Sequence, residues 1–483
     1  MSTSEPAPFV PSQPASGNFP PSPRRVFGSS AYFRLWMAQV VSSLGDWIGL
    51  VAVVALAARL SKGSSAAVGL VMAARMVPGF FLAPVGGVLV DRWDRRRTMV
   101  FCDLGRSAIV ATLPFVHTLL GLFLASFLLE VLTLLWSPAK DASVPNLVPA
   151  DKLAAANSLS MAAAYGTFPV GSAVFASLAG LASWLGHFHG LRRLQVNQES
   201  LALWADAATF LCSALLIRTL TLAAKPRDGG ARIDWGQTWR ELVEGLRFIR
   251  RNEAVRSVML GMGVGLIGCG SVVPLGPIYT TAVLGSGSAG FGLLMTGLGT
   301  GAALGVLALS VAARRLPTGP VFVTALFGAG VGLILVTSVP TLALAVVLAG
   351  VFGLFAGVCY VSGFTVIQER VDDALRGRMF ATLYTIIRFC LLLSLAVAPW
   401  VSSLLDRISR ALFSDGVIDV GIRVYIPGVR LTFWLGGLLT VGAGLLVSRD
   451  MMRAHGRGRH PSNGHGPPGD GQPEGDGGAG HGG

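Results

Sequence analysis

Long apolar runs separated by short polar segments fill the chain from about residue 30 to about residue 450. Each run approaches the roughly 20 apolar residues that a helix needs to cross a bilayer. A membrane β-barrel would instead show short segments of alternating hydrophobicity. The pattern predicts an all-α integral membrane protein with about twelve transmembrane helices. The expected spans are 33–60, 66–90, 98–117, 119–137, 155–186, 201–223, 256–283, 289–311, 318–338, 341–368, 379–405 and 430–448.

The longest polar segment between spans, residues 224–255, divides them into six and six. We therefore expect an N-terminal six-helix bundle at 31–223 and a C-terminal one at 256–448. Apolar residues in the linker recur four, three, four and three positions apart, which predicts an amphipathic helix: Trp235, Trp239, Leu242, Leu246 and Ile249. This helix either lies on the membrane surface or packs against the bundle, and the pattern is compatible with both.

The two ends of the chain have the composition of disordered tails. Residues 1–30 are rich in proline and serine and contain no apolar core, so they are not expected to be a signal peptide. Residues 449–483 are rich in glycine, histidine and proline. His187 and His189 in a polar loop lack a third ligand, so no metal site is expected.

Charge places the chain in the membrane. Charged residues make up 13% of the sequence, about half the share usual in soluble domains. With the N-terminus in the cytoplasm, the cytoplasmic segments hold 26 of the 38 lysines and arginines and the outer loops hold 8. This bias predicts a multi-pass protein of the cell (plasma) inner membrane with both termini cytoplasmic. It also explains the net charge of +13 without a nucleic-acid partner.

The polar turn between spans two and three is the most informative motif. It contains Gly87, Asp91, Arg92, Arg95 and Arg96 in the pattern Gly-x-x-x-Asp-Arg-x-x-Arg-Arg. Such a charge cluster cannot lie in hydrocarbon, so it must form a tight loop at the cytoplasmic face. The pattern resembles the signature loop of the major facilitator superfamily.

Further segments resemble one branch of that superfamily, the drug and siderophore exporters that include macrolide-efflux proteins and the enterobactin exporter. They lie at residues 137–149, 206–210 and 372–378, and the resemblance covers about residues 30 to 450. Two features depart from the family pattern. Asp94 stands where the wider superfamily usually has glycine, and residues 168–172 lack the Gly-Pro pair expected of antiporters.

The resemblance implies a monomeric transporter that works by alternating access in the membrane lipid. It implies that the loop between spans two and three meets the start of span eleven when the protein faces outward. Asp91 and Arg378 fit those two roles. A carboxylate at a helix N-terminus contributes about 0.3 to 2 kcal/mol, which suits a latch that must break and reform.

The chain shows no nucleotide-binding loop of its own, because none of its four lysines follows a glycine. The expected energy source is a proton gradient, which requires ionisable groups at membrane depth. A charge at mid-bilayer costs at least about 2.5 to 3.5 kcal/mol, so each such group needs a partner, water or a proton.

Asp46 and Glu130 are predicted proton or substrate sites within the spans, and Arg75 and Arg388 are assigned to the same site. Asp46 lies near the midplane of span one, and Glu130 lies in the inner half of span four. The resemblance places both spans beside a central cavity. A structural ion pair with Arg75 or Arg388 is the alternative interpretation for each acid.

Three other charged residues within the spans receive structural interpretations. Asp103 and Arg106 are three positions apart in span three and are expected to form a structural ion pair. Asp206 near the outer end of span six is expected to be hydrated.

The favoured function is proton-coupled efflux of amphipathic small molecules such as drugs, siderophores or natural products. An importer or exchanger of a specific metabolite on the same fold is the alternative, because of the incomplete antiporter pattern. An enzyme is not expected, since no histidine lies deep in a span and no nucleophile is paired with a base. No cofactor is expected.

Overall fold

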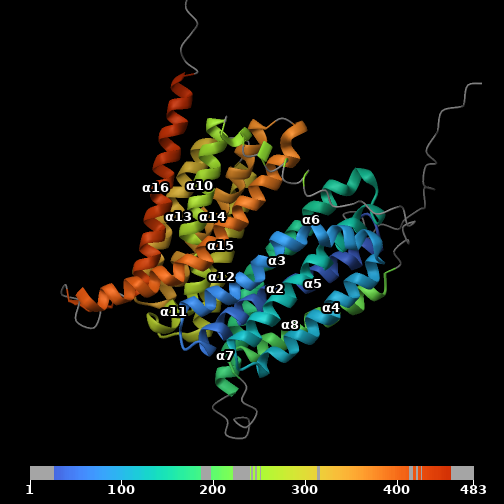
Figure 1. Ribbon diagram of the computed structural model, residues 1–483, viewed down its shortest axis with the longest axis horizontal. Helices are drawn as coiled ribbons and strands as arrows, with labels where there is room; N and C mark the ends of the chain where they lie inside the picture. The colour runs from blue at the N-terminus through green and yellow to red at the C-terminus, as the bar shows by residue number, and fades with distance from the viewer. Residues whose placement is uncertain are drawn as a thin grey trace, which may run out of the picture.

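The computed structural model describes residues 27–185, 197–220, 236, 240, 243–244, 247–250, 252–312, 316–371, 373–412, 417–419, 423–425 and 427–457. Within these ranges, 12 helical stretches are long and apolar enough to cross a membrane. The all-α prediction is therefore confirmed, and the helices form two groups inclined to each other (Figure 1).

The first half contains six spans, one of which is broken. Its helices are α2 (Ser30–Leu60), α3 (Ser65–Arg92), α4 (Arg95–Thr112), α5 (Leu119–Ser143), α6 (Leu153–Gly166), α7 (Phe168–Leu185) and α8 (Ser200–Arg218). The helices α6 and α7 together form the span expected at 155–186, with a break at Thr167.

The second half also contains six spans, one of which consists of two helices. Its helices are α10 (Glu253–Cys269), α11 (Val272–Ala282), α12 (Gly287–Ala312), α13 (Thr318–Ser338), α14 (Leu342–Arg370), α15 (Asp373–Leu412) and α16 (Gly428–Arg457). Here α10 and α11 share one span. Among the described residues, a two-stranded antiparallel hairpin, β1 (Val417–Asp419) with β2 (Arg423–Tyr425), interrupts the helical architecture.

Two predicted segment ends are wrong. Disorder is expected from residue 449, but α16 continues to Arg457, and Asp450 accepts a 2.8 Å hydrogen bond from Ser257 on α10. The segment between the last two expected spans, 406–429, is expected to be an outer loop. It is partly ordered, because α15 continues to Leu412 and the hairpin follows it.

The predicted linker helix is described only in part. Of the five apolar residues expected on one of its faces, Ile249 is buried in the core of the second half, and the other four lie outside the described residues.

Glycines allow the helices of the second half to pack closely. A Cβ added to Gly301 of α12 would come within 1.8 Å of the carbonyl oxygen of Gly350 on α14. A Cβ added to Gly353 of α14 would come within 2.0 Å of the carbonyl oxygen of Leu298. In lipid, where no hydrophobic force drives helices together, such backbone contact supplies the packing energy.

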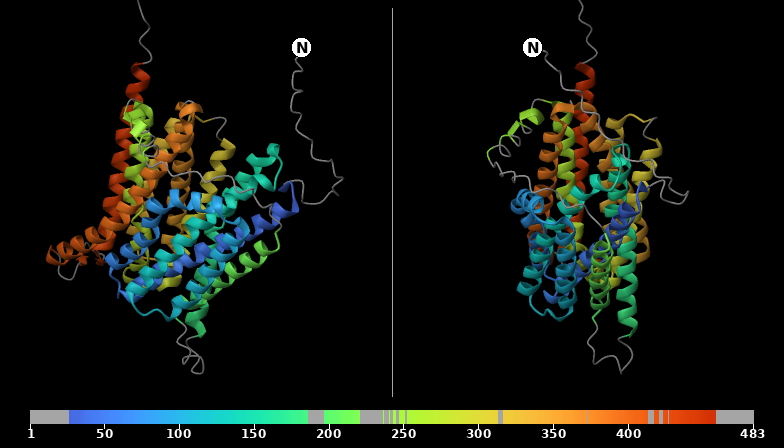
Figure 2. Two further views of the ribbon diagram at one scale, coloured as in Figure 1. Left: turned by 45° about the vertical axis from the view of Figure 1, so that its right-hand side comes forward. Right: turned by 90° about the vertical axis from the view of Figure 1, so that its right-hand side faces the viewer.

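The apolar cores show where the two halves join. Because the number of spans is even, α2 begins and α16 ends at the same end of the molecule, here called the termini end. One core is shared between the halves and lies toward the opposite end, where Phe175 of α7 and Phe291 of α12 both belong to it. Two further cores lie toward the termini end, and each is confined to one half. The halves are therefore joined at one end and separate at the other (Figure 2).

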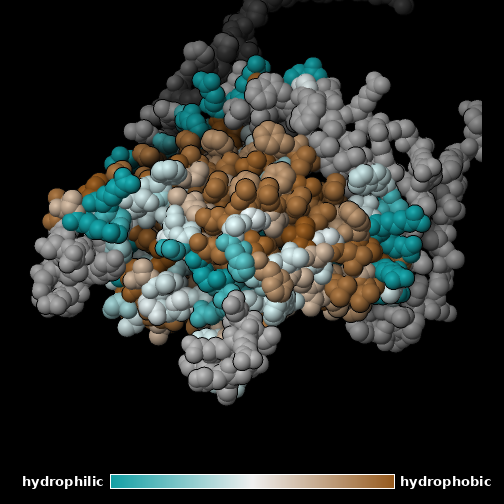
Figure 3. All heavy atoms as spheres, turned by 60° about the horizontal axis from the view of Figure 1, so that its bottom comes forward, coloured by the Kyte–Doolittle hydropathy of each residue, from teal (hydrophilic) through white to brown (hydrophobic). Residues whose placement is uncertain are grey.

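The distal end of α15 projects beyond the bundle (Figure 1). At 40 residues, α15 is about 60 Å long, twice the thickness of a hydrocarbon core. Every fourth residue near its end is apolar and exposed: Trp400, Leu404, Ile408 and Leu412. Seen with the opposite end turned forward, the surface has a broad apolar area bordered by hydrophilic side chains (Figure 3).

Candidate functional site

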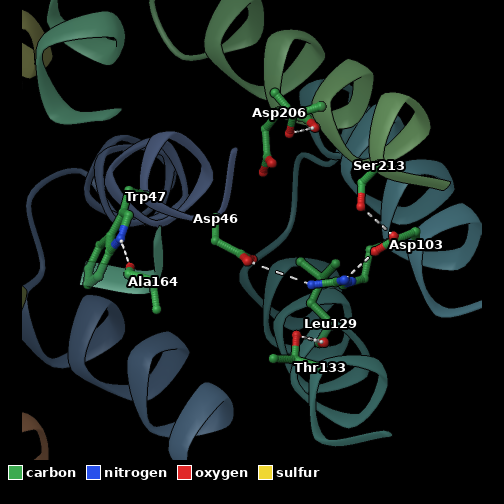
Figure 4. Close-up of polar contacts among 10 residues, drawn as sticks. Asp46, Trp47, Asp103, Leu129, Thr133, Ala164, Asp206 and Ser213 are labelled. Carbon is green, nitrogen blue, oxygen red and sulfur yellow. Dashed lines mark hydrogen bonds and ion pairs between the residues drawn. The ribbon is translucent and has the colours of Figure 1, made fainter. Parts of the chain in front are cut away.

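A buried charged cluster lies inside the first half, between α2, α4 and α8 (Figure 4). Arg106 of α4 is 1% exposed and forms an ion pair with Asp103, one turn earlier on the same helix. The Ser213 hydroxyl of α8 donates a 2.7 Å hydrogen bond to Asp103 Oδ2. Asp46 of α2 places its Oδ2 3.7 Å from Arg106 Nη1. One arginine thus links carboxylates from two helices.

Aromatic rings complete the surroundings of Arg106. Its guanidinium carbon lies 4.3 Å from the ring centroid of Phe210 and 5.2 Å from that of Trp136. Cation–π contacts of this kind strengthen when the cation is removed from water. The alternative interpretation of Asp46 predicts an ion pair with Arg75 or Arg388. Its ion pair is instead with Arg106, which α4 turns toward α2, and Arg75 interacts with it electrostatically at longer range.

Asp206 is buried, so its interpretation as a hydrated residue is wrong. It is 2% exposed and lies on α8 against the glycine face of α2. Its Oδ1 atom has no hydrogen-bond partner. Sequence reasoning missed this position because Gly45 and Gly49, which make room for the carboxyl group, lie about 160 residues earlier in the chain.

A small internal cavity joins these groups. Asp46, Arg75, Arg106 and Asp206 line it, and its free volume of about 10 Å³ matches one water molecule. Glu130 of α5 is half-buried and interacts electrostatically with Arg75 and Asp46, but forms no ion pair among the described residues.

Arg388 lies on the other half. It projects from α15, and its Nη1 lies 3.4 Å from the carbonyl oxygen of Gly79 on α3. The structure therefore places a cation of the second half against the backbone of the first.

The predicted gating motif is described only in part. The expected loop is shorter than the motif, because α3 runs through Gly87, Asp91 and Arg92 and α4 begins at Arg95. The side chains of 83–92 and of 372–378, which include Arg378, lie outside the described residues. Arg95 donates a 2.6 Å hydrogen bond to the carbonyl oxygen of Ala142, at the end of α5. Arg96 donates one of 3.1 Å to Leu220, just after α8. These two arginines fasten the loop to neighbouring helix ends.

Aromatic side chains gather between the halves. Tyr360 and Phe364 of α14 and Tyr384 of α15 are in ring contact, with centroids 4.6 Å and 5.8 Å apart. Tyr165 of α6 comes from the first half and interacts electrostatically with both tyrosines. Tyr165, Tyr360 and Tyr384 are exposed, so phenol groups from both halves face the same space.

A larger pocket, of about 510 Å³, lies between the halves at the opposite end. Arg59 and Glu199 form a 3.1 Å ion pair at its rim. Ser288 of α12 donates a hydrogen bond to the Gln198 side chain, which connects the second half to the first. Nothing in the sequence spacing indicates this pocket, because its walls come from four separate segments.

Together with the match of residues 21–400 to a family model, the twelve spans in two halves identify the chain as a transporter of the major facilitator superfamily. Within that superfamily, residues 21–400 match the family described as transmembrane secretion effector, and the chain belongs to this family. It is a transporter and not an enzyme. The predicted resemblance to the drug-exporter branch is thereby confirmed.

Relatives of known sequence carry transporter names. The multidrug efflux pump Tap of Mycobacterium tuberculosis (strain ATCC 25618 / H37Rv) is 26% identical over 354 residues, which cover 72% of this chain and 81% of that protein. The uncharacterized MFS-type transporter YfiS of Bacillus subtilis (strain 168) is 34% identical over 115 residues. That match spans 24% of this chain and 28% of YfiS.

Solved structures confirm the fold. A bacterial homolog of the human lysosomal transporter Spinster has a TM-score of 0.66 at 14% identity, covering 88% of this chain and 98% of that one. The nucleoside transporter NupG has a TM-score of 0.64 at 12% identity, covering 87% and 99%. At these identities the likeness concerns the fold alone.

Proposed function

We propose that the protein exports amphipathic small molecules through the plasma membrane by alternating access, driven by proton influx. The observation that carries the proposal is the buried cluster of the first half. Four carboxyl groups interact there with three arginines: Asp46, Asp103, Glu130 and Asp206 with Arg75, Arg106 and, from the second half, Arg388. Acids in excess of cations at membrane depth are typical of proton-carrying sites.

The aromatic group between the halves supports an amphipathic substrate. Its rings offer apolar stacking surface, and its phenol groups offer hydrogen bonds. Arg388, one turn after Tyr384 on α15, adds a cation that can attract an anionic substituent. The similarity to a protein named as a multidrug efflux pump agrees with a broad substrate range.

The separate cores at the termini end support a state open on that side. If the termini are cytoplasmic, as the charge bias predicts, this is the state that takes up substrate from the cell. The latch between Asp91 and the start of α15 then forms in the outward-facing state, when the two termini-end cores approach each other.

Transport into inverted membrane vesicles tests the proposal, with ethidium as a fluorescent amphipathic probe and a panel of siderophores and natural products beside it. Vesicles that contain the protein should accumulate at least one compound when their interior is acidic, and a protonophore should abolish this. Accumulation independent of the gradient would contradict proton coupling. Uptake in the reverse direction would favour the metabolite importer.

Two variants test the assigned residues in the same vesicles. Asp46→Asn should lose gradient-driven transport, and Asp91→Asn should slow it by weakening the latch. Asp151→Asn is the matched control, because this acid is exposed, lies away from the cluster and forms no ion pair among the described residues. Unchanged transport in both test variants would remove these two assignments.

A further inference from the structure

Asp206 lies at a close contact between α2 and α8. A Cβ added to Gly49 would lie 1.9 Å from Asp206 Oδ2, and one added to Gly45 would lie 2.5 Å from Asp206 Oδ1. These two glycines are about one turn apart on α2, so together they form a recess for the carboxyl group. In Figure 4 the Asp206 side chain points from α8 toward the space beside Asp46.

No cation is paired with Asp206 among the described residues. Its Oδ1 is buried without a hydrogen-bond partner, and the neighbouring Thr209 hydroxyl donates instead to the Asp206 carbonyl oxygen, at 2.7 Å. Arg106, the buried cation of the cluster, is already shared by Asp103 and Asp46. An ionised carboxylate without a partner is costly in such surroundings, whereas a neutral carboxyl group is not.

The charged groups around Asp206 come from three helices. Asp46 of α2, Arg75 of α3 and Arg106 of α4 all interact with it electrostatically. The helix α7, which also packs against α8, carries no charged residue between Phe168 and Leu185. The cavity, which has room for one water, is lined by Asp206, Asp46 and both arginines, and it offers a path by which a proton can leave.

We propose that Asp206 is a proton-binding site and carries the proton that drives transport. The carboxyl group is neutral while α2 and α8 are in contact. When α2 moves away and water enters the cavity, the O–H bond breaks, the proton passes to water, and the negative charge left on Asp206 is attracted to Arg106. Proton binding at Asp206 stands on the geometry alone, and its role as the driving proton rests on the proposed function.

Infrared spectroscopy of the purified full-length protein in lipid nanodiscs tests the site without any substrate. The C=O stretch of a neutral carboxyl group is separate from the bands of a carboxylate. Wild-type protein at neutral pH should show the neutral band, Asp206→Asn should lose its largest component, and the exposed-site control Asp151→Asn should retain it. An unchanged band in Asp206→Asn, or no neutral band in the wild type, would overturn the proposal.

Gel filtration and thermal unfolding establish that Asp206→Asn is folded, which the similar size of the amide favours. Transport in vesicles, measured with a compound that the wild type moves, then separates the proposed export function from the proposed role of Asp206. Asp206→Asn should still bind the compound but lose accumulation driven by the pH gradient. If the wild type moves no compound, the proposed function fails while the infrared result still decides the proton site. Full gradient-driven transport by Asp206→Asn would exclude it as carrier of the driving proton.

Discussion

Asp94 shows how one side chain sets the start of a helix. Its carboxylate accepts a 2.8 Å hydrogen bond from the backbone N–H of Arg97, so it is the N-cap of α4. The wider superfamily usually has glycine here, and aspartate and glycine are both accepted at N-caps. The departure from the family pattern therefore preserves the turn between α3 and α4.

Replacing Asp94 should cost stability in a graded way. Asp94→Ala should lower the free energy of unfolding by about 1 kcal/mol, because the cap is lost, and Asp94→Gly by only a few tenths. Thermal unfolding of the purified variants would measure the difference. Equal losses in the two variants would mean that the cap does not stabilise this helix.

Arg106→Ala should be among the most damaging single changes. Removing one partner of a buried ion pair costs about 3 to 5 kcal/mol, because it leaves a buried charge without compensation. Here Asp103 would keep only the Ser213 hydroxyl. The yield of monodisperse protein in gel filtration would report the loss, and Arg97→Ala, on the exposed surface of α4, is the matched control. A normal yield of Arg106→Ala would show that the cluster does not stabilise the fold.

At the scale of elements, the contact between α12 and α14 depends on glycine. Gly301→Ala would place a methyl group against the carbonyl oxygen of Gly350 and force the helices apart. We expect a loss of about 1 to 3 kcal/mol, as in other overpacked sites. Gly442→Ala on α16 is the control, since no atom lies within 4 Å of the added Cβ. Thermal unfolding that ranked the two variants equally would contradict close packing at Gly301.

Hydropathy predicted the spans well because each helix must satisfy its backbone within the bilayer. It failed at the ends of α15 and α16, where tertiary contacts extend a helix beyond the apolar run. The hydrogen bond from Ser257 to Asp450 is one such contact. Charged residues near the end of α15 suggested a loop, but Asp406 and Arg410 are four positions apart and pair on the helix surface.

At the scale of the molecule, the sequence predicted how deep each charged residue lies in the membrane. It did not predict which neighbouring helix the side chain faces. Asp46 lies at membrane depth as predicted, yet the rotation of α2 decides that it faces Arg106. The same rotation turns Gly49 toward Asp206. Hydrophobic patterns carry little information on rotation when a helix is apolar on all sides, as these helices are.

The contact between halves at the opposite end should break during transport. Ser288 and Gln198 are hydrogen-bonded there, and Ser65 donates a 3.2 Å hydrogen bond to the carbonyl oxygen of Pro399. A disulfide between Gln198→Cys and Ser288→Cys should stop transport by holding this end closed. A reducing agent should restore it, and each single variant is a control. Transport that continued after complete cross-linking would show that this end does not open.

The projecting end of α15 links this motion to the lipid. Its exposed apolar face, from Trp400 to Leu412, suits the boundary between headgroups and acyl chains. The same helix contacts α3 at Ser65, so separation of the halves must turn this segment within that boundary. The bilayer then resists the conformational change that transport requires. We expect turnover to depend on headgroup crowding and acyl-chain length even where substrate affinity does not.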